Sequence, residues 1–168
     1  MPRKWHLAQI NVGTIKYLHD DPRMSGFMGR LDEINALADN SPGFVWRLQS
    51  DSGNATDIDV GGEPLFLANM SVWESSEALF DYVYKSMHRE ILIKRRNWFE
   101  RPKGLYQVLW WIPAGHIPSA QDGLDRLELL KELGPTPQAF NFKTLFPQPG
   151  EDEKSDSMSP EKFCSGWD

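Results

Sequence analysis

The sequence predicts an α+β protein of the ferredoxin-like type, in which an antiparallel sheet is built in the order βαββαβ and a further helix follows. Four short segments alternate apolar and polar residues, and two segments with helical spacing separate them in that order. The chain has 168 residues, 40% hydrophobic and 25% charged, which suits a single domain. We expect this domain to span residues 1–147 and the polar stretch 148–168 to form a disordered tail.

The first half of the chain predicts two strands with a helix between them. Residues 5–15 form the first strand, in which Gln9 and Asn11 share one face with Leu7. Asp21 and Pro22 then supply an N-cap and a first-turn proline, and the Ser-Pro-Gly of 41–43 ends the helix. Residues 44–49 predict the second strand, and the polar stretch 50–64 predicts a long loop.

The second half predicts two more strands and two helices. In the third strand, residues 65–73, Asn69, Ser71 and Trp73 share one face, and the other face is apolar. Ser75 or Ser76 can cap a helix that runs to about Glu100. The remaining elements are a strand over 106–113, a helix over 119–133 and a short edge strand over 140–146.

This topology leaves one face of the sheet without helices. We expect that face to carry Trp73 and one of Trp110 and Trp111, because neighbouring strand residues point to opposite faces. That is too much apolar surface to leave in water. Since the chain has no internal repeat, a second copy of the sheet would have to cover the face, and the sequence predicts a face-to-face homodimer.

Several functional classes are excluded by composition and missing motifs. The net charge is −6 and the 18 Lys and Arg residues are scattered, which argues against nucleic acid or an anionic membrane as partner. No run of about 18 apolar residues could span a membrane. Cys164 is the only cysteine, which fits the cytoplasm. The four histidines form no H-x-H or H-E-x-x-H pair, and the Rossmann and G-x-S-x-G motifs are missing, so we expect no metal site, dinucleotide cofactor or serine nucleophile.

Several segments together resemble a known family, the bacterial and fungal domain of unknown function 3291. The resemblance covers about residues 5–145 and is most specific in VWES at 72–75, in the eight-residue spacing from His88 to Arg96, and in WWIPAGHIP at 110–118. It implies a place among the dimeric α+β barrels. That superfamily includes cofactor-free quinol and anthrone monooxygenases, haem enzymes, an isomerase and simple binding proteins, so the fold alone does not define a reaction.

Three residues are candidates for catalysis by similarity to the Asn–Trp–His set of haem-degrading members. They are Asn11 on the first strand, Trp73 at the end of the third strand and His88 on the helix that follows. An amide can hold a substrate oxygen or O2, an indole can stack on a ring, and an imidazole can move a proton or ligate iron. The alternative is that Asn11 caps a strand end, Trp73 packs in the core and His88 is partly exposed.

Further residues are candidates for substrate binding. Gln9, Asn69 and Ser71 lie on the same sheet face as Asn11, where a polar aromatic substrate or bound water would satisfy them. Tyr84 lies one turn before His88, and either Trp110 or Trp111 can reach the cavity.

We therefore expect a cytoplasmic dimer that oxygenates an aromatic or polycyclic small molecule in secondary metabolism, either without a cofactor or with haem. One alternative is an isomerase or dehydratase that uses the same proton-transfer groups without O2. The other is a dimer that binds a small molecule without turnover.

Overall fold

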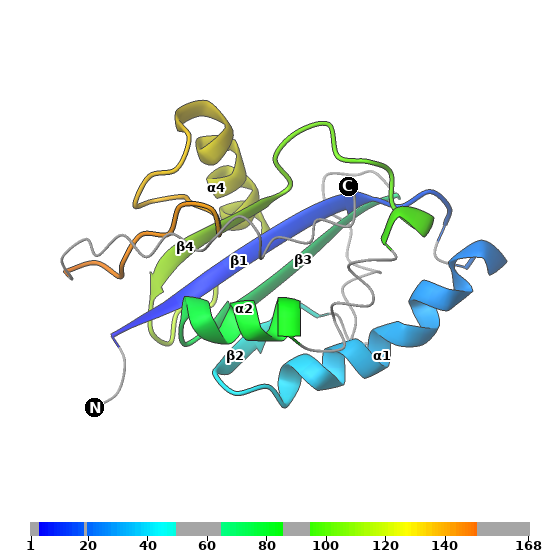
Figure 1. The fold of residues 1–168 in the computed structure, drawn as a ribbon, viewed down its shortest axis with the longest axis horizontal. Coiled ribbons are helices and arrows are strands. Elements are labelled where there is room, and N and C mark those ends of the chain that lie inside the picture. Colours follow the sequence, from blue (N-terminus) through cyan, green and yellow to red (C-terminus); the bar gives the residue numbers. More distant parts are fainter. Residues whose placement is uncertain (1–3, 19, 50–64, 86–94, 151–168) are drawn as a thin grey trace.

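A computed structural model describes residues 4–18, 20–49, 65–85 and 95–150 (Figure 1). Its strands form one antiparallel sheet in the order β2-β3-β1-β4, which is the ferredoxin-like arrangement that the sequence predicts. In chain order the elements are β1 (Trp5–Thr14), the short 3-10 helix η1 (Pro22–Met24), α1 (Ser25–Asp39), β2 (Phe44–Arg47), β3 (Phe66–Trp73), α2 (Ser76–Lys85), the 3-10 helix η2 (Arg95–Asn97), β4 (Gln107–Pro113) and α4 (Ala120–Leu133). Within the described parts of the chain, no helix is both long and apolar enough to cross a membrane.

Local hydrogen bonds cap the helices, and the predicted N-cap at Asp21 has the expected geometry. Asp21 accepts a hydrogen bond from the backbone N–H of Arg23 at 2.9 Å and so caps η1. Ser119 and Asp122 form a reciprocal capping box at the start of α4. Gly43 has a φ of 81°, which a residue with a Cβ rarely adopts, and this turn leads the chain from α1 into β2.

Helices α1 and α2 cover the sheet face that carries Trp73, so the prediction that this face is bare is wrong. On one face, Leu7, Trp73 and Leu109 pack with α2 residues such as Leu79 and Phe80. The other face packs against α4 residues Leu127 and Leu130 through a second cluster, which includes Ala8, Ile10, Met70, Val72, Val108, Trp110 and Ile112. The predicted bare surface does not exist, because Trp73 and Trp110 are 0% and 1% exposed within a single chain.

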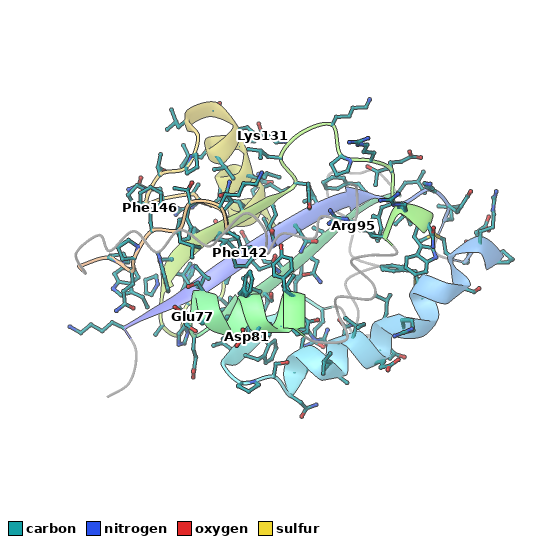
Figure 2. All side chains as sticks on the ribbon, in the orientation of Figure 1. Glu77, Asp81, Arg95, Lys131, Phe142 and Phe146 are labelled. Carbon is teal, nitrogen blue, oxygen red and sulfur yellow. The ribbon has the colours of Figure 1, made fainter. Side chains whose placement is uncertain are left out.

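Two predicted elements differ from the structure, one at its C-terminal end and one over most of its length. The helix predicted to reach Glu100 is wrong at its C-terminal end, because Phe99 bridges Ile15 and the Glu100 N–H donates to the Thr14 carbonyl at 2.7 Å. The predicted strand over 140–146 is reduced to an isolated bridge between Phe140 and Leu109 and a turn at 141–144. This segment instead packs aromatic rings beside α2, where Phe142 lies (Figure 2).

Close packing of α4 on the sheet depends on Gly123. A Cβ at this buried position would lie 2.7 Å from Ile10 Cδ1 and 3.0 Å from Ile10 Cβ. We expect Gly123→Ala to lower the free energy of unfolding by about 1–3 kcal/mol, because overpacking outweighs the better helix propensity of alanine. Gly29→Ala is the matched control, since a Cβ added at this exposed position of α1 would meet no atom within 4 Å. It should raise stability by about 0.5–1 kcal/mol in urea unfolding, and equal effects of the two variants would contradict the packing argument.

Candidate functional site

Strand register brings five polar side chains together on the sheet face that α1 and α2 cover. Asn11 lies opposite Asn69 on β3 and opposite Gln107 on β4. Two residues earlier on the same strand, Gln9 lies opposite Ser71. Because strand residues two apart share a face, these side chains form a single patch, which we call the polar floor. The polar floor consists of Gln9, Asn11, Asn69, Ser71 and Gln107.

Gln9 is the centre of the hydrogen-bond network in the polar floor. Its Nε2 donates to Ser71 Oγ at 2.8 Å and to Asn69 Oδ1 at 3.0 Å, and its Oε1 accepts from Asn11 Nδ2 at 3.1 Å. Gln9 is 3% exposed, so these bonds satisfy a buried amide. Ser71 Oγ also accepts from Trp73 Nε1 at 2.8 Å. With two bonds accepted, the Ser71 hydroxyl has its own hydrogen left to donate to a ligand.

A cavity of about 200 Å³ lies over the polar floor. Its apolar walls come from α1, α2 and the segment after η2, and they include Phe27, Leu31, Ile34, Leu79, Val83 and Phe99. A cavity of roughly 150 Å³ already accepts one benzene ring, so this one is large enough for a small ring molecule. Most of its lining is apolar with a few converging polar groups, which is the usual character of a small-molecule site.

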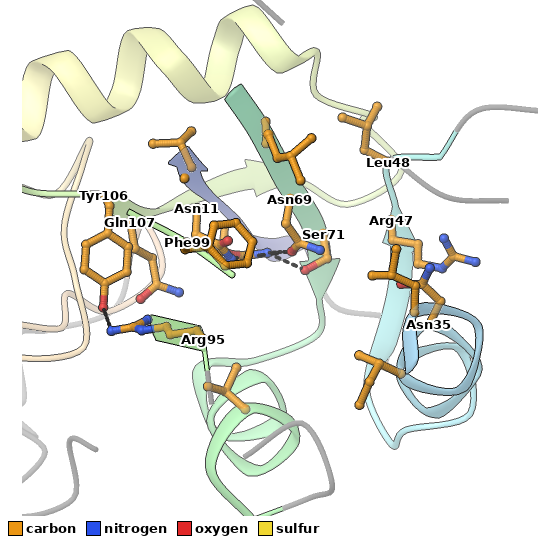
Figure 3. Close-up of a pocket in the computed structure, with 18 of the residues that line it drawn as sticks. Asn11, Asn35, Arg47, Leu48, Asn69, Ser71, Arg95, Phe99, Tyr106 and Gln107 are labelled. Atoms are coloured by element: carbon orange, nitrogen blue, oxygen red, sulfur yellow. Dashed lines mark hydrogen bonds between the residues drawn. The ribbon is translucent and has the colours of Figure 1, made fainter. Parts of the chain in front are cut away.

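Among the described residues, the arginines that line the same cavity are Arg30, Arg47 and Arg95. Arg95 Nη2 donates to the Tyr106 hydroxyl at 2.7 Å, and its guanidinium carbon lies 4.9 Å from the centre of the Tyr106 ring. Arg47 binds Asp39 through Nε at 2.7 Å and Nη2 at 3.3 Å. Figure 3 shows Arg95 and Arg47 on opposite sides of the cavity, with Asn11, Asn69 and Ser71 between them.

Trp73 lies beside the polar floor, two residues beyond Ser71 on the same face of β3. Its ring stacks on Tyr82 with centroids 5.0 Å apart and meets Phe44 edge to face at 5.5 Å. Tyr82 lines the cavity and donates its hydroxyl to the Ile34 carbonyl at 3.3 Å. Burial raises the pKa of the Tyr82 hydroxyl far above its usual value, so this group stays protonated and acts as a neutral donor.

The structure brings together five of the nine residues proposed from the sequence. Gln9, Asn11, Asn69, Ser71 and Tyr84 all line the cavity. The other four are not among its described lining residues, and they are Trp73, His88, Trp110 and Trp111.

Three tryptophans proposed for the cavity therefore lie elsewhere. Trp73 donates its indole N–H to Ser71 and is not among the described residues that line the cavity. The expectation that it stacks on a substrate there is therefore wrong. Trp110 and Trp111 point to opposite faces, as predicted. However, Trp110 packs under α4, and Trp111 donates its Nε1 to the Phe146 carbonyl at 3.0 Å. His88 lies outside the described residues.

Several lining residues were not predicted from the sequence. Gln107 is the first residue of β4. Because it alternates with Leu109 and Trp111, the sequence could have placed it on the same sheet face as these two residues. Three further described lining residues come from separate elements that converge at the cavity, and they are Arg47, Arg95 and Tyr106. Their neighbours in the sequence therefore gave no indication that they line it.

The described residues offer no cluster that could hold a metal ion, and the described lining of the cavity has no histidine, cysteine or methionine. In the parts of the chain that the structure describes, no three His, Cys, Asp or Glu side chains come together. The described lining residues include no histidine, cysteine or methionine, which are common ligands of haem iron.

Comparison with known proteins identifies the family and a set of distant structural neighbours. No curated protein matches the chain. A cofactor-independent oxygenase from Streptomyces nogalater, SnoaB, is 12% identical, covers 67% of this chain and 95% of its own, and has a TM-score of 0.42. A protein of unknown function from Nitrosomonas europaea is 10% identical, with coverage of 71% and 100% and a TM-score of 0.44. A candidate antibiotic biosynthesis monooxygenase from Chloroflexus aurantiacus is 12% identical, with coverage of 68% and 97% and a TM-score of 0.38. A family model matches residues 6–156, and the protein therefore belongs to the family described as domain of unknown function DUF3291.

Proposed function

We propose that the cavity binds a small, flat ring molecule with oxygen substituents, and that the protein oxidises this molecule with O2 without a bound cofactor. The observation that carries the proposal is the polar floor, which faces the apolar and aromatic walls of the cavity. A ring would lie between the apolar walls, and its oxygens would face the amides and the hydroxyl below.

The polar floor can bind a negatively charged ring oxygen. Asn69 Oδ1 accepts from Gln9 at 3.0 Å and lies 3.5 Å from Asn11 Nδ2, so the amide nitrogen of Asn69 is left to donate. The Ser71 hydroxyl supplies a second donor. Two donors held in place by the hydrogen bonds of Gln9 stabilise a phenolate or enolate oxygen without having to reorient when the charge develops.

The proposed reaction balances without an added reductant. An acidic ring methylene loses a proton to a base, and the resulting enolate reduces O2. The carbon loses both hydrogens and gains one oxygen atom as a ketone, the other oxygen atom leaves as water, and all four electrons come from the substrate. His88 is the proposed base on the strength of the sequence, and we expect His88→Ala to lower the rate about a hundredfold or more. An unchanged rate would show that His88 has no such role.

The reaction is tested with anthrone and 1,3-indandione, two flat ketones with an acidic methylene. Purified protein is mixed with each compound under air, under argon and under ¹⁸O₂, and products are measured by mass spectrometry against protein-free samples. We expect protein-dependent product only with O2, and one ¹⁸O atom in the anthraquinone formed from anthrone.

The other outcomes identify the alternatives. Equal product under argon would contradict oxygenation and favour an isomerase or dehydratase. Saturable binding of both ketones without any product would contradict catalysis and favour a non-catalytic binding protein.

We also propose that the protein forms a homodimer through the part of the α4-side face that α4 leaves partly open. Val12, Trp46, Leu48 and Phe66 are only partly buried there, although they pack on the apolar cluster under α4. Light scattering at micromolar concentration should give twice the chain mass, and a monomer would contradict this assembly. A cytoplasmic location and a role in secondary metabolism stay predictions from the sequence.

A further inference from the structure

The indole N–H of Trp73 fixes the direction of hydrogen bonding at one end of the polar floor. An indole nitrogen can only donate a hydrogen bond. It donates to Ser71 Oγ at 2.8 Å, and Gln9 Nε2 donates to the same oxygen at 2.8 Å. Since that oxygen then accepts two bonds, the group that Ser71 offers to a ligand is its own O–H, which is a donor.

The amides of the polar floor are ordered in the same way. Gln9 Nε2 also donates to Asn69 Oδ1 at 3.0 Å, and Gln9 Oε1 accepts from Asn11 Nδ2 at 3.1 Å. Asn11 Nδ2 lies 3.5 Å from Asn69 Oδ1, so the nitrogen of Asn11 and the oxygen of Asn69 both face the network. The two opposite atoms are Asn11 Oδ1 and Asn69 Nδ2. Within the described residues, neither of them takes part in a further hydrogen bond.

The polar floor therefore offers donors and an acceptor from two neighbouring strands. The donors are Ser71 Oγ and Asn69 Nδ2 on β3, and the acceptor is Asn11 Oδ1 on β1. Asn11 lies directly opposite Asn69, and Figure 3 shows both beside Ser71 in the lining of the cavity. Opposite side chains on paired strands have Cβ atoms roughly 4.5–5.5 Å apart. One substituent of a ring, or two on adjacent ring atoms, can therefore reach both groups.

We propose that the natural ligand carries an acceptor oxygen next to an N–H or O–H donor on its ring. Ser71 and Asn69 bind the oxygen, and Asn11 Oδ1 binds the donor. Trp73 is a positioning residue, because its N–H keeps the Ser71 hydrogen available for the ligand. This inference rests on the proposed function for the presence of a ring in the cavity, and it adds the chemical class of the ring substituents.

The test compares two neutral ring compounds that differ by one donor group. They are 1-hydroxy-2-naphthamide and 1-hydroxy-2-acetonaphthone, in which the same carbonyl carries an NH2 group or a methyl group of similar size. The ring hydroxyl bonds the neighbouring carbonyl in both compounds, so only the amide offers a donor to the protein. Binding to the full chain is measured by calorimetry. We expect the amide to bind about tenfold more tightly, because the ketone leaves Asn11 Oδ1 desolvated and without a partner.

A variant of Asn11 tests the acceptor directly. Asn11→Leu keeps a side chain of similar shape without an acceptor, and it should bring the affinities for the two compounds within about twofold of each other. Asn97→Leu is the matched control, because Asn97 is exposed in η2 and is not among the described residues that line the cavity. This control should keep the full preference for the amide. Circular dichroism confirms that each variant is folded.

A double-mutant cycle tests the positioning role of Trp73. Ser71→Ala should weaken the binding of both compounds by a similar factor, because both present the same carbonyl to the Ser71 hydroxyl. Trp73→Phe should also weaken both in the native background, since the Ser71 hydrogen then loses its fixed direction. In the Ser71→Ala background, Trp73→Phe should have no further effect on affinity. A purely structural role of Trp73 would instead lower the affinity equally in both backgrounds.

The outcomes separate this inference from the proposed reaction. Equal binding of amide and ketone to the native protein, or a preference that survives in Asn11→Leu, would contradict it, as would no saturable binding of either compound. An equal effect of Trp73→Phe with and without Ser71 would contradict the role of Trp73. An amide preference that Asn11→Leu abolishes supports the inference, even where the O2 experiments show no turnover. In that case only the oxygenase proposal fails.

Discussion

Trp73→Ala should lower the free energy of unfolding by about 3–5 kcal/mol, the range expected when a buried Trp or Phe is truncated to alanine. Trp73 is 0% exposed, stacks on Tyr82 and meets Phe44 edge to face. Truncation leaves a cavity beside both rings and removes the donor to Ser71 Oγ. Urea unfolding followed by circular dichroism measures the loss.

A second variant separates the ring of Trp73 from its indole N–H. Trp73→Phe keeps an aromatic ring against Tyr82 and removes the bond to Ser71, so we expect a loss of about 1–2 kcal/mol. Trp111→Phe is the matched control, because it removes an indole bond to the Phe146 carbonyl from a half-buried ring. Its effect should be smaller, since water can replace the lost donor. A Trp73→Ala protein within about 1 kcal/mol of the native stability would contradict this account of the buried aromatic cluster.

Gln9→Met should weaken binding of 1-hydroxy-2-naphthamide about tenfold or more and lower stability by about 2 kcal/mol. The side chains are similar in length, but methionine cannot make the three hydrogen bonds of Gln9 to Ser71, Asn69 and Asn11. Without them, Ser71 and Asn69 lose the partner that orients their donors toward the cavity. Calorimetry measures the affinity, and urea unfolding measures the stability.

The control for Gln9→Met is a glutamine outside the site. Gln121 lies on α4 and bonds Asp125 in an exposed pair, so Gln121→Met should change neither affinity nor stability appreciably. An affinity of Gln9→Met within about twofold of the native value would show that Gln9 does not organise the binding surface.

The sequence was sufficient for the sheet and for most of the polar floor. Strand alternation alone places Gln9 and Asn11 on the same face of the first strand, and Asn69 and Ser71 on the same face of the third. Pairing of these two strands then brings the four side chains together. The N-cap at Asp21 was also predictable, because it acts through a bond to a residue only two positions away.

The walls of the cavity could not be predicted in the same way, because they depend on contacts between distant segments. Alternation places Trp73 on the correct face, but only the packing of α2 shows that Tyr82 covers its ring. The helix predicted to reach Glu100 failed for a similar reason. Its apolar spacing is compatible with a helix, whereas the observed segment after η2 bonds to the end of β1 and places Phe99 against Gly13.

The central claim is that a ligand lies on the polar floor between the sheet and helices α1 and α2. The most direct test is a ¹⁵N–¹H correlation spectrum of the protein titrated with 1-hydroxy-2-naphthamide, in which side-chain amides and indoles are resolved. We predict that the side-chain N–H signals of Gln9, Asn11 and Asn69 and the indole signal of Trp73 shift together and saturate. The indole signal of Trp110, on the opposite face under α4, should not move. Saturable shifts at Trp110 with none at Asn11 and Asn69 would contradict the account.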